Sequence, residues 1–335
     1  MNVGNTTGRL KQIDLHVPSD TFLADTLAGL AATPKTLQPK YFYDERGSEL
    51  FEEITELQEY YVTRTEIGIM QQYQAEMCAE FAPNTTLVEL GSGASVKTLY
   101  LLREAARRAL NLTYVPIDIS RDFLFKTAAE LSSRFPDLNV SAVCADFLDG
   151  VRWVKDQDFC GSDQTVVYFP GSTIGNFEQD KALELLQSIN RLLRPGDAFL
   201  LGTDMIKDRD VLQQAYDDSA GVTAAFNLNI LTRINRELGA NFPVHDYTHV
   251  ALFNPELERM EMHLESQSNH VVALGGQSFP VQAGERIHTE CSHKYTPEKV
   301  RALAAETGYE LRQTWMDVNS YFGVHYMVVP QRTQG

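Results

Sequence analysis

Apolar positions along the chain switch between two spacings, and this predicts strands and helices in alternation from about residue 66 to residue 206. Short apolar runs bounded by turn residues are typical of buried strands, whereas apolar residues three and four apart indicate helices. We expect helices over 66–81, 99–109, 121–133 and 180–193, and strands over 87–90, 113–119, 140–144, 165–169 and 198–203. Such alternation predicts right-handed crossovers and a parallel, doubly wound sheet.

On either side of this region the pattern differs. Residues 207–240 read as helices, with strands expected over 248–253, 259–266 and 271–274. A helix over 297–306 and strands near 312–317 and 326–329 can return to the first sheet. The polar residues 1–12 predict a flexible tail, and a helix is expected over 19–32 with Ser19 as its N-cap.

These patterns predict an α/β fold with two domains. The first is a Rossmann-like, doubly wound domain made of residues 65–206 plus 294–335. The second is a smaller α+β domain made of residues 13–64 plus 207–293.

Composition disfavours several classes of protein, including nucleic-acid-binding and membrane-spanning proteins. The formal net charge of −16 disfavours binding to nucleic acid, which recruits clusters of Lys and Arg. The sequence has no run of 18 apolar residues, so no membrane span is expected. The N-terminus has no signal-peptide pattern. The four cysteines form no C-x-x-C pair, which is typical of reduced thiols. We therefore expect a cytoplasmic protein that binds a small molecule; the oligomeric state stays open, and a monomer is compatible with the sequence.

The strongest local motif is a strand followed by Gly91-Ser92-Gly93 and then a helix. Glycines there allow a tight turn beneath a ligand at the carboxyl end of the first strand. Asp118 ends the next strand, where a carboxylate can accept ribose hydroxyls. Asp146 and Phe147 follow the third strand and suit an adenine, the carboxylate toward its exocyclic amine and the ring beside it.

Two cofactors compete for this layout. A dinucleotide needs a third glycine so that a helix N-terminus can approach its pyrophosphate, and that position is Val96 here. S-adenosylmethionine has no phosphate, so the difference does not count against it. The motif therefore favours S-adenosylmethionine, and Lys97, early in the following helix, could meet the carboxylate of the cofactor.

Several longer stretches resemble a known family. They are KYFYDERGS at 40–48, EYYVTRTE at 59–66, VELGSG at 88–93, YFPGSTIGN at 168–176, EMHL at 261–264 and TECS at 289–292. Over nearly its whole length the chain resembles the histidine-specific Nα-methyltransferases of ergothioneine biosynthesis. The resemblance implies a methyltransferase domain, a substrate-binding domain, and an amino acid held between them.

The resemblance also implies roles for individual residues. The cofactor would be held by Gly91, Gly93, Lys97, Asp118, Asp146 and Phe147. Asn176 and Tyr216 would bind the substrate carboxylate, with Gly171 near the amine. Tyr60, Glu290 and Ser292 would hold the imidazole, with Phe51 and Met262 lining the pocket.

Elementary chemistry is compatible with those roles. Amide and phenol groups can donate to a carboxylate without adding a cation, and Glu290 can accept an imidazole N–H. Three successive methylations to a betaine are implied by the resemblance. No side chain is assigned as a dedicated base, since the amine can lose its proton to water or to a nearby carboxylate.

Alternatives remain at this point. Relatives act on tryptophan or prenylated tryptophan, so an indole amino acid is the rival substrate, and an inactive cofactor-binding partner protein is the rival class. A catalytic metal is not expected, because the H-E-x-x-H pattern is absent and His245 with His249 lacks an obvious third ligand.

Overall fold

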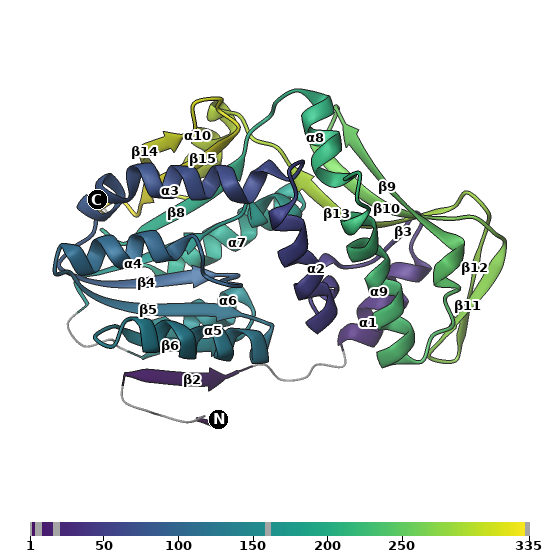
Figure 1. The fold of residues 1–335 in the computed structure, drawn as a ribbon, viewed down its shortest axis with the longest axis horizontal. Coiled ribbons are helices and arrows are strands. Elements are labelled where there is room, and N and C mark those ends of the chain that lie inside the picture. The colour runs from purple at the N-terminus through teal and green to yellow at the C-terminus, as the bar shows by residue number, and fades with distance from the viewer. Residues whose placement is uncertain (1, 4–8, 16–20, 158–161, 332–335) are drawn as a thin grey trace. The chain divides into compact units, whose positions relative to one another are not determined.

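The computed structural model describes residues 2–3, 9–15, 21–157 and 162–331, and the chain divides into two compact units (Figure 1). The first unit comprises Met1–Val17, Val62–Ile206 and Tyr295–Gly335, and the second comprises Pro18–Tyr61 and Lys207–Lys294. Each unit has its own sheet.

The first unit contains a nine-stranded sheet with the order β1-β2-β6-β5-β4-β7-β8-β15-β14. Strands β2, β6, β5, β4, β7 and β8 run parallel to one another, whereas β1 pairs antiparallel with β2, β15 with β8, and β14 with β15. The bounds are β1 Asn2–Val3, β2 Leu10–Asp14, β4 Asn84–Leu90, β5 Asn111–Asp118, β6 Asn139–Cys144, β7 Gln164–Phe169, β8 Ala198–Asp204, β14 Glu310–Met316 and β15 Phe322–Val328. This arrangement confirms the predicted Rossmann-like, doubly wound sheet.

Helices cover both faces of this sheet. Apolar side chains of α6, α7 and α10 form one core with alternate residues of the strands, such as Val88, Val115 and Val167. Figure 1 shows α3, α4 and α5 on the opposite face. The bounds are α3 Tyr61–Ala79, α4 Thr98–Arg107, α5 Arg121–Arg134, α6 Phe147–Asp156, α7 Gln179–Leu192 and α10 Pro297–Glu306. Helix α6 was not expected from the sequence.

The prediction of a flexible tail over residues 1–12 is wrong for its last residues. Leu10–Asp14 forms strand β2, which pairs in parallel with β6. Leu10 and Ile13 are both buried. The open edge of β6 supplies backbone partners for this segment, and two buried apolar side chains suffice to anchor it. Residues 13–15 consequently belong to the first unit rather than to the second.

The order in which the chain adds strands to the sheet reverses at β4: β5 and β6 follow on one side of it, and β7 and β8 follow on the other. In open parallel sheets, ligands bind outside the carboxyl ends of the strands at such a switch point. The loops after β4, β5, β6 and β7 all leave the sheet at this edge, because these strands run parallel.

The second unit is built on a four-stranded sheet with the order β3-β13-β10-β9, next to a β11-β12 hairpin. Its helices are α1, α2, α8 and α9, and α9 packs against α2 and β9. The bounds are α1 Thr21–Ala31, β3 Lys35–Thr36, η1 Pro39–Phe42, α2 Glu45–Glu56, α8 Arg209–Tyr216, α9 Val222–Leu238, η3 Val244–Asp246, β9 Tyr247–Asn254, β10 Arg259–Ser266, β11 His270–Leu274, β12 Gln277–Val281 and β13 Arg286–His293.

Three local features complete the picture. Helix α2 was not expected from the sequence, and the side chain of Asp44 caps it by accepting the Gly47 N–H. The expected N-cap Ser19 and Cys160 lie outside the described residues, whereas Cys78, Cys144 and Cys291 are buried thiols that form no disulfide with one another. Within the described part of the chain, no helix combines the length and apolar character needed to cross a membrane.

Candidate active site

The glycine loop after β4 presents backbone rather than side chains. Gly91 and Gly93 have φ values of +68° and +48°, in the left-handed region that favours glycine. The Gly91 N–H donates to the Ile117 carbonyl at 2.9 Å, which fixes the loop to the end of β5. A Cβ placed on Gly93 would meet no atom within 4 Å. The loop therefore leaves room for a ligand against its own backbone.

Asp118 ends β5 directly beside this loop. Its two carboxylate oxygens accept the Gly93 N–H at 3.1 Å and the Ser120 N–H at 2.9 Å. Desolvation raises the pKa of Asp118, although these backbone N–H groups oppose the rise. A carboxylate offers about four lone-pair sites, so two bonds leave capacity for ligand hydroxyls.

Asp146 and Phe147 lie where β6 leads into α6. Asp146 is the N-cap of that helix and accepts the Asp149 N–H at 3.0 Å. The Phe147 ring makes an edge contact with Phe169, with ring centroids 5.0 Å apart. A Cβ added to Gly91 would lie 3.7 Å from the Phe147 ring, so the ring is adjacent to the glycine loop.

These residues fit an adenosyl group. Among the described residues, the buried hydroxyl of Ser92 is left without a hydrogen-bond partner in the middle of the glycine loop. Bare backbone, an acceptor carboxylate and an aromatic ring thus meet at the switch point, as a nucleoside requires. The structure brings together Gly91, Gly93, Asp118 and Phe147, with Asp146 adjacent to Phe147 in the chain.

A buried ionic cluster joins the loops after β4 and β7. Glu66 on α3 is fully buried and forms an ion pair with Lys97, with 2.6 Å between the Glu66 Oε2 and Lys97 Nζ atoms. The same carboxylate accepts the Gly171 N–H and the Tyr168 hydroxyl, each at 2.9 Å. Glu66 therefore positions both Lys97 and Gly171. That Lys97 also contacts the cofactor carboxylate stays a prediction.

The loop after β7 holds Gly171 and Asn176. Gly171 has φ +73°, and a Cβ there would approach the Lys97 Nζ to 3.2 Å. Ser172 also has positive φ, and its hydroxyl accepts the Asp204 N–H at 2.9 Å. The loop then forms the short helix η2, Thr173–Asn176, which ends at the half-buried Asn176.

In the second unit, the polar side chains of Tyr216, Ser292 and Lys294 form a triangle of hydrogen bonds. The Tyr216 hydroxyl donates to the Ser292 Oγ at 2.8 Å, and the Lys294 Nζ donates to both oxygens at 2.9 Å. Lys294 is only 1% exposed, and its Nζ lies 4.7 Å from the centroid of the Tyr216 ring. Because Ser292 already accepts twice, its own O–H remains available as a donor.

Glu290 shares a face of the sheet with Ser292. Alternate residues of a strand point to the same side, and the cross-strand partners of Glu290 and Ser292 are Met262 and Met260. Glu290 is buried, and this desolvation raises its pKa to about 7, against the opposing attraction of Lys294. A buried donor, a buried acceptor and the Met262 side chain therefore occupy one side of the sheet.

A row of aromatic rings leads away from Tyr216, which is hydrogen-bonded to Ser292. The Tyr60 ring makes an edge contact with Tyr216, with centroids 6.4 Å apart, and Phe51 contacts Tyr60 in the same way at 6.4 Å. Phe226 of α9 lies 6.0 Å from Phe51. The second unit thus gathers Phe51, Tyr60, Tyr216, Met262, Glu290 and Ser292, whereas Gly171 and Asn176 belong to the first unit.

Comparison with known proteins decides the family. Residues 22–329 match the family described as histidine-specific methyltransferases that depend on S-adenosylmethionine. The chain belongs to this family.

Relatives within the histidine-specific methyltransferase family are similar over most of their length. The histidine N-alpha-methyltransferase of Mycolicibacterium smegmatis is 42% identical over 91% of this chain and 94% of its own. The enzyme of the same name from Mycobacterium tuberculosis is 40% identical over 90% and 92%. A more distant relative, the 4-dimethylallyltryptophan N-methyltransferase of Claviceps purpurea, is 28% identical over 90% and 92%.

Membership of this methyltransferase family confirms the predicted enzyme class and the predicted cofactor, S-adenosylmethionine. Sequence reasoning missed two residues of the sites described above, Glu66 and Lys294. Their positions in the sequence did indicate a functional role, because they lie in or next to stretches that resemble the family. Glu66 ends the EYYVTRTE stretch, and Lys294 follows TECS by two positions. Their burial could not be recognised, because a charged residue in a helix or at a strand end is usually exposed.

Proposed function

We propose that this protein transfers methyl groups from S-adenosylmethionine to the α-amino nitrogen of L-histidine, in three successive reactions that give Nα,Nα,Nα-trimethylhistidine. The observation that carries the proposal is the pairing of a buried acceptor, Glu290, with a buried donor, Ser292, in a histidine-specific methyltransferase. We further propose that the product enters ergothioneine biosynthesis and that the enzyme is cytoplasmic, in keeping with the buried, reduced thiols of Cys78, Cys144 and Cys291.

In this proposal the cofactor is held by the first unit. Asp118 accepts the ribose hydroxyls, Asp146 and Phe147 hold the adenine, and Gly91 and Gly93 let the ligand approach the backbone. Lys97 faces the cofactor carboxylate from its ion pair with Glu66. When bound, S-adenosylmethionine supplies an electrophilic methyl group.

Asn176 and Tyr216 hold the substrate carboxylate, and Gly171 lies near the amine. A phenol has a single proton, and Tyr216 gives it to Ser292 in this structure. Binding a carboxylate through Tyr216 therefore requires that proton to turn toward the substrate, while Lys294 keeps its bond to Ser292. Holding carboxylate and amine in one orientation supplies the alignment on which methyl transfer depends.

In this proposal Glu290 and Ser292 make the site favour the imidazole of histidine over an indole. A neutral imidazole has one N–H donor and one acceptor nitrogen, which match a carboxylate and a hydroxyl proton. Tyr60 can bond the same ring nitrogen as Ser292. An indole has no second ring nitrogen and would leave the Ser292 O–H unpaired, at a cost of about 1–3 kcal/mol.

The deciding experiment presents purified protein with S-adenosylmethionine and each of the twenty amino acids, and reads product masses. We expect histidine to gain three CH₂ units. Modified tryptophan, with histidine unchanged, would instead support the indole substrate suggested by the Claviceps relative. Cofactor binding without any methylated amino acid would contradict the proposal and favour a non-catalytic role.

A further inference from the structure

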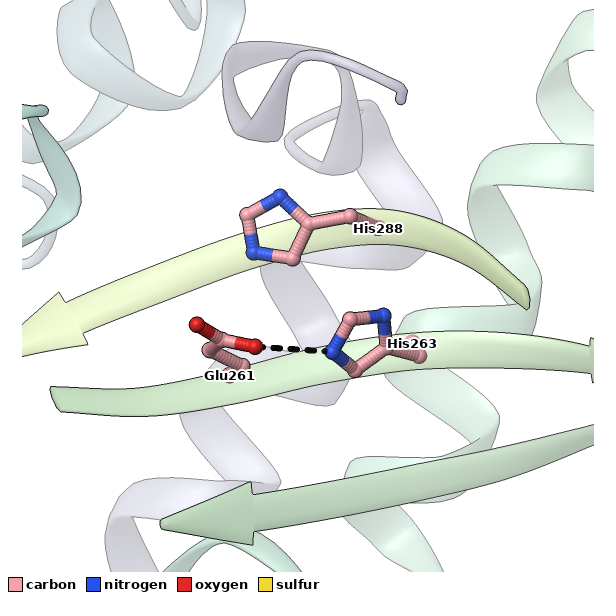
Figure 2. A group of neighbouring side chains, drawn as sticks. All are labelled: Glu261, His263 and His288. Carbon is pink, nitrogen blue, oxygen red and sulfur yellow. Dashed lines mark hydrogen bonds and ion pairs between the residues drawn. The ribbon is translucent and has the colours of Figure 1, made fainter. Parts of the chain in front are cut away.

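Glu261 and His263 of the EMHL stretch have no part in the proposed function. Met262 faces Glu290, whereas Glu261 and His263 are its neighbours on β10 and point to the opposite face of the sheet. On that face they meet His288 of β13, and Figure 2 shows the three side chains turned toward one another. Their ligand atoms all lie within 4.8 Å of one another.

A β-bulge creates this cluster. Met262 pairs with Glu290, but His263 pairs with His288, so Thr289 is an extra residue in β13. With regular pairing His263 would lie opposite Thr289 instead, and His288 would point to the other face. The bulge therefore re-aims His288 toward His263, and their ring centroids are 5.0 Å apart.

The bulge is held by specific bonds. The hydroxyl of Thr289 donates to the Asn227 side-chain oxygen at 2.8 Å and contacts the Met262 carbonyl at 3.0 Å. Asn227 donates in turn to the His263 carbonyl at 3.1 Å. The position of both histidines on the sheet is thus fixed by the fold of the second unit.

The carboxylate is also oriented. Arg259 and Asn254 donate to its Oε1 atom at 2.8 and 3.1 Å, which leaves the Glu261 Oε2 atom directed at His263. The distance from Oε2 to the His263 Nε2 is 3.2 Å. Ligand atoms of a tetrahedral zinc ion are about 3.3 Å apart, given bonds of about 2.0–2.1 Å. Outer donors of this kind are typical of metal-binding carboxylates.

We propose that Glu261, His263 and His288 form a binding site for a divalent transition-metal ion of the zinc type, separate from the methyl-transfer residues. Two imidazoles and one carboxylate are a ligand set that zinc accepts, with water in the fourth position. The side chains of Glu261 and His263 are 11% and 13% exposed, so the site is shielded yet open to an ion. The ion would join β10 to β13 behind Met262 and Glu290, and stabilise the sheet that carries them.

The test measures Zn²⁺ binding by calorimetry on the full chain, with any affinity tag removed, after chelator treatment and in the absence of histidine. We expect one Zn²⁺ per chain and an increase in Tm. His263→Asn and His288→Asn should each weaken binding by about 100-fold or more. His245→Asn is the matched control, because this histidine of the same unit is 85% exposed and should leave binding unchanged.

Co²⁺ supplies a second readout. Four-coordinate Co²⁺ gives intense visible absorption, so the wild-type protein should show it and Glu261→Gln should lose most of it. A wild-type circular dichroism spectrum and a cooperative thermal melt of the metal-free protein report that the second unit of each variant is folded. The proposal is overturned if Zn²⁺ does not bind stoichiometrically, or if binding survives in both His263→Asn and His288→Asn.

Discussion

Two buried ionisable residues on one side of the second sheet differ in their hydrogen-bonding chemistry: Glu290 is an acid that can accept hydrogen bonds, and Lys294 donates them. Glu290 carries a burial-raised pKa of about 7, and Lys294 directs its N–H groups at Tyr216 and Ser292. Neither is placed for stability alone, because burying a charge costs free energy unless its partners compensate. In the proposed function this arrangement binds a polar ligand, and the predictions at this scale follow from that proposal.

Glu290→Ala should weaken histidine binding far more than cofactor binding. In the proposed function the carboxylate accepts the ring N–H, and removing a charged partner of a hydrogen bond costs about 2–3 kcal/mol, or roughly 30- to 150-fold in Kd. Calorimetric titration with each ligand measures both losses. Glu256→Ala, an exposed glutamate of the same unit, is the control. An equal loss of both affinities in Glu290→Ala would contradict the assigned role.

The same residue predicts a pH dependence. Glu290 is ionised only above its raised pKa of about 7, so its contribution to histidine binding grows as pH rises through that value. The ratio of histidine affinities, wild type over Glu290→Gln, should therefore increase from pH 6 to pH 8. Taking the ratio removes the titration of free histidine, which is the same for both proteins. A ratio that stays constant over this range would refute the prediction.

Lys294→Met keeps most of the length of the side chain but removes the ammonium group and both of its hydrogen bonds. Ser292 and Tyr216 lose a shared partner, so we expect KM for histidine to rise by about tenfold or more while the Kd for S-adenosylmethionine stays the same. Loss of the nearby cation should also shift the pH profile of histidine binding upward, because Lys294 lowers the pKa of Glu290. A purely structural role would lower stability without moving that profile.

Strand β2 is the element whose importance the structure changes most. It closes one side of the parallel sheet at β6, and Ile13 joins the core beneath the sheet. Ile13→Ala should lower the free energy of unfolding by about 2–4 kcal/mol, the usual cost of such a truncation in a core. Urea unfolding measures the change, with Lys11→Ala at an exposed position of the same strand as the control. Equal effects of the two substitutions would show that β2 contributes nothing through its core contact.

At the scale of the whole molecule, buried glutamates contribute to the response of stability to pH. Glu89 in the first unit accepts from the Tyr114 hydroxyl, and its pKa is also raised to about 7 by burial. An acid whose pKa is higher in the folded state than in the unfolded state stabilises the fold while it is protonated. That contribution is complete below about pH 4.5 and is lost as pH rises to about 7.

Glu290→Gln should therefore become more stable relative to wild type between pH 5 and pH 8. A shift from 4.5 to about 7 sets an upper bound of about 3 kcal/mol on this gain. Urea unfolding at both pH values measures it, and Glu256→Gln should show no such trend. A difference between Glu290→Gln and wild type that does not vary with pH would rule out this linkage.

Local patterns were enough to predict the α/β class and the glycine loop with Asp118 and Phe147. Periodicity, turn residues and strand ends depend on neighbours in sequence, and parallel strands bring their ends to one edge automatically. The remaining candidate site residues, such as Asn176 and Glu290, were predicted only from the resemblance to a known family. Their roles stay predictions.

Long-range pairing decided the rest. Whether Leu10–Asp14 becomes a strand depends on the free edge of β6, more than 120 residues away in the chain. Whether Glu66 and Lys294 are buried depends on Gly171 and Tyr216, which come from other elements. One extra residue, Thr289, turns His288 toward His263, because a shift of one position in register moves a side chain to the other face of a sheet.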